Sequence, residues 1–182
     1  MLRPLYVFLF KFFGWRVNGG FPPGLKKYIV AVAPHTSNMD FLIGVATRSI
    51  QRMQNARFLA KSSLFKPPFG WIFKMIGGYP VDRGKNTDMV EQAAAIFGTE
   101  DHFILAIAPE GTRRKVEKLR TGFYYIARKA GVPIIPVGFD YGKKEVIIGN
   151  PFFPSDNVTN DIEVLTSFYR NIRGRNPELG IG

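Results

Sequence analysis

Apolar residues follow two different spacings along this chain. Short, mostly apolar runs predict buried strands, which are expected at residues 28–33, 57–61, 103–108, 133–141 and 145–148. Between them, apolar residues recur every three or four positions and predict helices, which are expected at residues 41–54, 87–97, 121–129 and 161–172. Strands that alternate with helices indicate an α/β fold with a largely parallel central sheet flanked by helices.

The N-terminal stretch from Leu2 to Trp15 is aromatic and basic. Its apolar run is broken at Lys11, so it falls short of the roughly 20 residues that span a bilayer, and no small-x-small cleavage motif follows it. This favours an amphipathic helix at a membrane interface. A Gly/Pro-rich hinge at residues 18–24 follows, so we expect residues 1–17 to form the membrane-interface segment and residues 18–182 to form one domain.

A second aromatic and basic stretch, residues 64–76, is interrupted by Pro67 and Pro68. Its pattern matches neither a strand nor a helix. Phe residues beside Lys and Arg suit the headgroup region of a membrane, as in the N-terminal stretch.

Charge and composition narrow the classes of partner. The chain of 182 residues carries 25 Lys and Arg against 14 Asp and Glu, a net charge of +11, which predicts an anionic partner such as nucleic acid, anionic lipid or a phosphorylated substrate. The 17 Phe residues favour lipid. The absence of Cys excludes disulfides, a thiol nucleophile and thiolate metal sites, and it fits a reducing cytoplasm.

His35 and Asp40 straddle the turn between the first predicted strand and the helix that follows. Five residues along a continuous helix rotate by about 140°, but a turn ending at Ser37 allows Asp40 to fold back toward His35. A carboxylate on one ring nitrogen would leave the other free to accept a proton, which makes the pair a candidate general base. The alternative is that Asp40 merely caps the helix and His35 is a turn residue.

A second group, Glu110, Gly111, Thr112 and Arg113, directly follows the strand at residues 103–108. Because ligands collect at the carboxyl ends of strands in open α/β sheets, His35 and this group are expected to face one crevice. Gly111 allows close backbone approach, Thr112 can donate to an oxyanion or phosphate, and Arg113 can bind phosphate oxygens. A charged turn without such a function is the alternative.

Four blocks in this order resemble the glycerophospholipid acyltransferase family, which includes 1-acyl-glycerol-3-phosphate acyltransferases. The resemblance covers about residues 28–140. It is carried by the His-x-x-x-x-Asp block, by Glu-Gly-Thr-Arg, by Arg83 of the second block, and by the Val-Pro-Ile-x-Pro-Val block at residues 132–137. Residues 79–81 depart from the longer apolar run that relatives often carry before the arginine, which leaves the acceptor open.

The resemblance implies a direct acyl transfer from acyl-CoA or acyl carrier protein to a lyso-lipid hydroxyl in phospholipid biosynthesis, at the cytoplasmic face of the membrane. His35 is then the general base and Asp40 orients it, while the phosphate binders are Arg83 and Arg113. The other implied site residues are Glu110, Gly111 and Thr112 for positioning the acceptor and Val132, Pro133 and Pro136 for the acyl or donor side. Neither metal nor organic cofactor is expected.

Three alternatives remain open from sequence. The acceptor could be glycerol 3-phosphate or a lyso-ornithine lipid instead of 1-acyl-glycerol-3-phosphate. The chain could be a catalytically silent lipid-binding protein, or a nucleic-acid-binding module, which the charge would also fit. Nucleic-acid binding would leave the spacing of His35, Asp40, Glu110 and Arg113 unexplained, and we therefore expect no nucleic-acid partner.

Overall fold

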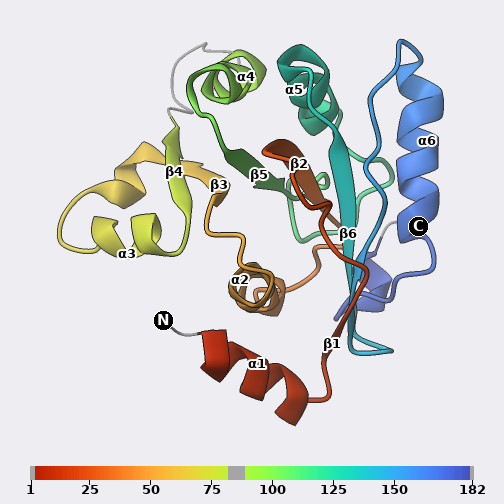
Figure 1. Cartoon of the computed structure of the whole chain (residues 1–182). Helices are drawn as coiled ribbons and strands as arrows, with labels where there is room; N and C mark the ends of the chain where they lie inside the picture. The colour runs from red at the N-terminus through yellow and green to blue at the C-terminus, as the bar shows by residue number, and fades with distance from the viewer. Residues whose placement is uncertain (1–2, 82–88, 181–182) are drawn as a thin grey trace.

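The computed structural model describes residues 3–81 and 89–180, which contain a seven-stranded sheet with the order β1-β7-β6-β2-β5-β3-β4 (Figure 1). The strands are β1 Arg16–Asn18, β2 Lys27–Val32, β3 Ala56–Lys61, β4 Gly78–Val81, β5 Phe103–Ile107, β6 Ile134–Asp140 and β7 Glu145–Ile148. Every neighbouring pair is parallel except β6 and β7, which are antiparallel. The predicted α/β fold with a largely parallel sheet is confirmed.

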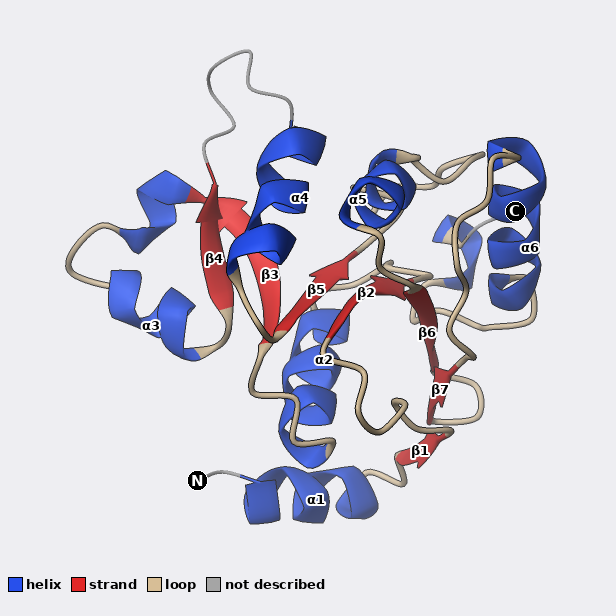
Figure 2. Cartoon of the chain, turned by 45° about the horizontal axis from the view of Figure 1, so that its top comes forward, coloured by secondary structure: helices blue, strands red, loops and turns tan. Residues whose placement is uncertain are grey.

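Helices cover both faces of the sheet, as Figures 1 and 2 show. One face carries α4 (Met89–Thr99), α5 (Gly122–Ala130) and α6 (Val158–Tyr169), and the other carries α1 (Arg3–Phe12) and α2 (Met39–Ile50). The alternation of β2 explains the two layers: Ile29 and Ala31 pack toward α4 and α5, whereas Tyr28 and Val30 pack toward α1 and α2. Because β2 is buried on both faces, its sequence is a nearly continuous run of apolar residues.

Most predicted elements agree with the structure to within three residues. The predicted strands correspond to β2, β3, β5, β6 and β7, and the predicted helices correspond to α2, α4, α5 and α6. Helix α5 ends at Ala130 and is capped by Gly131, whose φ of 64° is left-handed and therefore favours glycine. The predicted start of the helix at residue 87 lies outside the described residues.

Two strands, the segment at residues 62–76 and a 3-10 turn after α6 were not predicted. Strand β1 has three residues and strand β4 contains Pro80, which is tolerated because β4 is the edge strand of the sheet. The unassigned stretch at residues 64–76 folds as a 3-10 turn, η1 (Ser62–Phe65), followed by α3 (Gly70–Met75). A second 3-10 turn, η2 (Pro177–Leu179), follows α6. Short elements carry too few periods for a pattern to be recognised.

The N-terminal helix α1 is tied to the rest of the domain. Phe10 is 7% exposed and joins the same core as Tyr28 and Ile43, whereas Phe8 and Phe12 are 62% and 71% exposed. The predicted boundary after residue 17 falls inside β1, which pairs with β7. Within residues 3–81 and 89–180, no helix is long and apolar enough to cross a membrane.

Candidate active site

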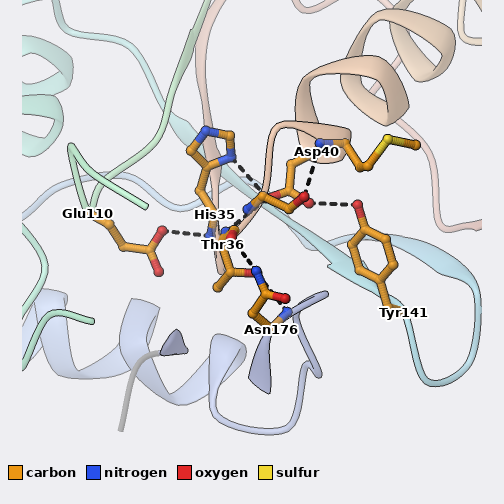
Figure 3. Close-up of polar contacts among 8 residues, drawn as sticks. His35, Thr36, Asp40, Glu110, Tyr141 and Asn176 are labelled. Atoms are coloured by element: carbon orange, nitrogen blue, oxygen red, sulfur yellow. Dashed lines mark hydrogen bonds and ion pairs between the residues drawn. The ribbon is translucent and has the colours of Figure 1, made fainter. Parts of the chain in front are cut away.

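The two sequence groups meet because β2 and β5 are parallel neighbours. Residues 27–31 pair in register with residues 103–107, so the chain leaves both strands at the same edge of the sheet. The backbone N–H of His35 donates a 2.6 Å hydrogen bond to Oε2 of Glu110. Figure 3 shows the Glu110 carboxylate on one side of the His35 turn and Asp40 on the other. His35, Gly111, Thr112 and Arg113 line one cavity, as expected, whereas Glu110 is buried beneath the His35 turn and does not face the cavity.

Asp40 holds the turn that carries His35. Its Oδ2 lies 3.2 Å from Nδ1 of His35 and accepts 2.8 Å hydrogen bonds from the backbone N–H groups of Thr36 and Ser37. The Ser37 hydroxyl accepts a hydrogen bond from the N–H of Met39, the first residue of α2. Of the two alternatives that the sequence offered, the structure shows the contact of Asp40 with the imidazole; the N–H groups that Asp40 accepts from belong to the turn before α2, and the N-cap residue Asn38 makes no side-chain cap.

Asp40 is an ionised carboxylate in a buried position, with a relative exposure of 1%. Burial by itself raises the pKa of Asp40, but the hydrogen bonds from His35, Tyr141 and the Ser37 amide outweigh it, and the pKa lies below its ordinary value. A charged Asp40 on Nδ1 leaves Nε2 of His35 as the nitrogen that can take a proton. The His35 side chain is 20% exposed and faces a cavity.

Tyr141 is a site residue that sequence reasoning missed. Its hydroxyl donates a 2.7 Å hydrogen bond to Oδ1 of Asp40 (Figure 3). Burial and this bond raise the pKa of Tyr141 above its ordinary value, so it stays a neutral donor. The ring of Trp15 packs edge-on against it, with centroids 5.1 Å apart. One signal existed, because Tyr141 ends the predicted strand at residues 133–141, at the same sheet edge as His35.

Asn176 is a second missed residue, and it secures the turn from the C-terminal side. Its side-chain amide donates to the carbonyl of Thr36 at 2.8 Å, and its backbone N–H donates to the Thr36 hydroxyl at 3.2 Å (Figure 3). No pattern in the sequence marks this residue, which lies in an irregular loop after α6.

Glu110 lies behind His35 and is buried, with a relative exposure of 1%. Burial raises the pKa of Glu110 from 4.5 to about 7, while the bond from the His35 N–H acts in the opposite direction. Its Oε1 has no hydrogen-bond partner among the described residues. A buried carboxyl under the His35 turn is costly when charged, so it is a candidate for a functional role.

Gly111 follows Glu110 with a φ of 65°, which favours glycine. A Cβ at this position would lie 2.9 Å from Nε of Arg120, so the residue also allows the Arg120 side chain to cross the loop. Thr112 accepts a hydrogen bond from the N–H of Arg114. These residues and Arg113 line the mouth of the cavity, which therefore carries three exposed arginines: Arg113, Arg114 and Arg120.

The cavity beside His35 has a volume of about 950 Å³, in the range of pockets that hold a substrate. Much of the remaining lining is apolar and comes from α2, β3 and β6, with Phe41, Gly44, Val45, Phe58 and Phe139 among its residues, while Arg48 of α2 and Arg57 of β3 also contribute. A lining that combines arginines with many apolar side chains suits an amphiphile that carries an anionic head and a hydrocarbon chain.

The structure does not bring every predicted site residue to this cavity. Val132 is buried in the core beneath α5, and neither Val132 nor Pro133 nor Pro136 is among the lining residues, although the adjacent Val137 is. Their predicted acyl-side role stays a prediction. Arg83 lies outside the described residues. No group of three or more His, Asp or Glu residues that could hold a metal ion occurs in the part of the chain that the structure describes.

The fold and site define an α/β protein with a His–Asp pair, a candidate general base, beside a cavity lined by arginines and apolar side chains. The family described as Acyltransferase matches residues 19–140, and the chain belongs to this family. This confirms the resemblance that the four sequence blocks indicated.

Relatives in the family carry related names. The chain is 30% identical to the 1-acyl-sn-glycerol-3-phosphate acyltransferase of Escherichia coli strain K12 over 69% of this chain and 53% of that protein. It is 28% identical to the Streptococcus pneumoniae protein of the same name over 76% of this chain and 52% of that protein. The chain thus spans about half the length of these relatives.

The fold also matches a solved structure. The 1-acyl-sn-glycerophosphate (LPA) acyltransferase PlsC from Thermotoga maritima superposes with a TM-score of 0.60, covering 92% of this chain and 76% of that chain at 23% sequence identity. This likeness supports the fold.

Proposed function

We propose that the protein is an O-acyltransferase that moves a fatty acyl group from a thioester to the free hydroxyl of a lysophospholipid, with 1-acyl-glycerol-3-phosphate as the acceptor. The observation that carries this proposal is the His35–Asp40 pair beside a cavity whose lining combines arginines with many apolar side chains. Family membership and the names of its relatives support the same reaction.

The pair supplies a general base. Nε2 of His35 removes the proton of the acceptor hydroxyl while its oxygen bonds to the thioester carbonyl carbon, and Asp40 stabilises the imidazolium that forms. The carbon–sulfur bond then breaks, and the thiolate takes the proton back from His35. The products are an ester and a free thiol, and the residues named here require no covalent enzyme intermediate.

Positioning falls to the loop after β5. Arg113, with Arg114 and Arg120 in the same cavity lining, would bind the phosphate of the acceptor, because guanidinium groups match phosphate oxygens in charge and geometry. Gly111 and Thr112 lie at the same mouth, while Glu110 fixes the backbone of His35 from behind. The acyl chain would occupy the apolar interior lined by Phe41, Phe58 and Phe139.

The partners follow from this chemistry. Acyl-CoA and acyl carrier protein are both anionic thioester donors, so a net charge of +11 accommodates either. Because the acceptor resides in a bilayer, the enzyme would work as a peripheral or monotopic protein at the cytoplasmic face, with α1 at the interface through Phe8 and Phe12. No metal or organic cofactor is needed for this transfer.

Thiol release tests the proposal. Acyl-CoA and acyl carrier protein thioesters are offered with 1-acyl-glycerol-3-phosphate, glycerol 3-phosphate and lyso-ornithine lipid, and the wild type is compared with His35→Ala. We expect acceptor-dependent release that falls by at least about 10³-fold in the variant. The chain has two histidines, and His102, which is exposed on the surface, provides the control His102→Ala with unchanged activity. Turnover that survives His35→Ala, or silence with every pair, would refute the assignment.

A further inference from the structure

The segment of residues 62–76, here called the η1–α3 unit, projects from the β3–β4 edge of the sheet (Figures 1 and 2). Its inner side is packed. The rings of Phe65 and Phe73 lie with centroids 6.0 Å apart, and a Cβ on Gly70 would fall 2.0 Å from the carbonyl oxygen of Phe65. Glycine at this position lets α3 pack directly on the end of η1, so the unit presents a fixed outer surface.

That outer surface is apolar and exposed. Phe69, Trp71 and Met75 are 64%, 63% and 62% exposed, and Leu64 is 44% exposed. Among the described residues, six large apolar side chains exceed 60% exposure, and three of them belong to this unit. Trp71 and Met75 are four positions apart in α3 and therefore lie on one face. Clustered exposure of this kind marks an interaction surface.

The charge of the surface selects its partner. Lys61, Lys66 and Lys74 are exposed around the apolar side chains, and the sequence from residue 56 to residue 81 contains no Asp or Glu. Lysine is depleted at the cores of protein interfaces, whereas aromatic residues interleaved with lysine are typical of the headgroup region of a membrane. An anionic bilayer would attract the exposed lysines through its surface charge and would accommodate the aromatic side chains among its headgroups.

The unit is continuous with the candidate active site. Ile76, which follows α3, lines the cavity together with Phe58 and Leu59 of β3. A bilayer that receives Trp71 would therefore lie against the rim of the cavity, and this point rests on the proposed function because it concerns the route of a lipid acceptor.

We propose that the η1–α3 unit is a membrane-contact site additional to α1, which inserts Phe69, Trp71 and Met75 among the headgroups of an anionic bilayer. The two contacts are on different elements, α1 on α2 and α3 at the far edge of the sheet. Together they fix the orientation of the domain on the membrane, which one helix alone would leave free to rotate.

Trp71 itself reports insertion. The chain has two tryptophans, so Trp15→Phe leaves Trp71 as the only one and retains an aromatic ring beside Tyr141. Vesicles of phosphatidylcholine with phosphatidylglycerol should shift the emission of Trp71 to the blue, and brominated acyl chains should quench it. If the protein binds these vesicles while the emission of Trp71 stays that of a water-exposed indole, the proposal is wrong.

Partition measurements give an independent readout. We expect Phe69→Ser with Trp71→Ser to lower the partition coefficient on anionic vesicles by about tenfold or more, and Lys66→Gln or Lys74→Gln to lower it by about fivefold each. The matched control is Phe153→Ser. Phe153 is 67% exposed but lies after β7, outside the η1–α3 unit, so this variant should bind vesicles like the wild type. All these side chains are exposed, so thermal unfolding without vesicles should be unchanged.

The readouts separate this inference from the proposed function. Vesicle binding should be the same in His35→Ala, and a wild type that binds through Trp71 without thioester turnover would refute only the proposed function. If Phe69→Ser with Trp71→Ser leaves vesicle binding intact but weakens binding of acyl carrier protein in solution, the surface docks a protein and the membrane proposal is overturned.

Discussion

The hydroxyl of Tyr141 donates a 2.7 Å hydrogen bond to Oδ1 of Asp40, across a separation of 101 positions in the sequence. Asp40 Oδ2 is already occupied by His35 and by two backbone N–H groups of the turn. Tyr141 therefore fixes the second oxygen of the carboxylate that orients the candidate base. A residue that acts through Asp40 in this way positions the site without touching the substrate.

Tyr141→Phe tests that role while it retains the ring contact with Trp15. We expect kcat to fall by about tenfold, because one bond to a charged acceptor is lost and three donors remain. The hydroxyl also helps to hold the pKa of Asp40 low, so the variant should lose activity at a higher pH on the acid side. A pH–rate profile with thiol release checks both. The same profile for Tyr125→Phe, at an exposed position, should match the wild type.

Glu110→Gln should change how stability depends on pH. The pKa of Glu110 is raised from 4.5 to about 7 in the folded state, so the unfolded state loses this proton first as pH rises. Below about pH 4.5 the Glu110 carboxyl therefore costs no folding stability. Its cost grows between about pH 4.5 and about pH 7, and above that range it amounts to about 3 kcal/mol of unfolding free energy. Glutamine keeps an acceptor for the His35 N–H and removes the ionisation.

Denaturant unfolding at pH 5 and pH 8 measures this effect. We expect the variant to be more stable than the wild type at pH 8, with a much smaller difference at pH 5. Glu117→Gln, an exposed carboxyl on the same loop, is the control and should change stability little at either pH. An equal difference between wild type and Glu110→Gln at both values would contradict the assignment.

Gly44→Leu should shorten the acyl chain that the enzyme accepts. Gly44 lines the apolar interior from α2, and a Cβ there would lie 3.8 Å from the Phe139 ring, an ordinary contact. A leucine side chain would then take space from the substrate, and each methylene that no longer fits costs about tenfold or more in kcat/KM. In the variant, kcat/KM should fall for long-chain thioesters and change little for medium-chain thioesters. Gly98→Leu places the same side chain on α4 in open space and should leave the preference unchanged.

Arg113→Gln should weaken binding of the acceptor phosphate. The loss of charge-assisted hydrogen bonds predicts a KM raised by about tenfold or more for 1-acyl-glycerol-3-phosphate, with little effect for an uncharged monoacylglycerol. Steady-state kinetics with both acceptors distinguish the two effects. Lys118→Gln removes a charge from the same loop without altering the cavity lining, so an equal rise in KM there would indicate only long-range electrostatics.

The sequence by itself determined the α/β fold, because buried parallel strands need continuous apolar runs and the helices between them need a spacing of three or four residues. It also indicated the pairing of His35 with Asp40 as one of two alternatives, since the pair lies within one turn and its geometry is local, and the structure decided between them. The link between His35 and Glu110 was accessible because both follow strands whose carboxyl ends meet in a parallel sheet.

Only the tertiary structure decided which distant residues complete the site. Tyr141 and Asn176 reach the turn because β6 lies beside β2 and the chain after α6 folds back, and neither arrangement leaves a periodic signal. The sequence also did not show which side chains of residues 62–76 are exposed. Whether an aromatic residue packs inward like Phe73 or outward like Trp71 depends on what lies against it. Local patterns encode backbone conformation and burial, whereas contacts between remote segments depend on how the whole sheet assembles.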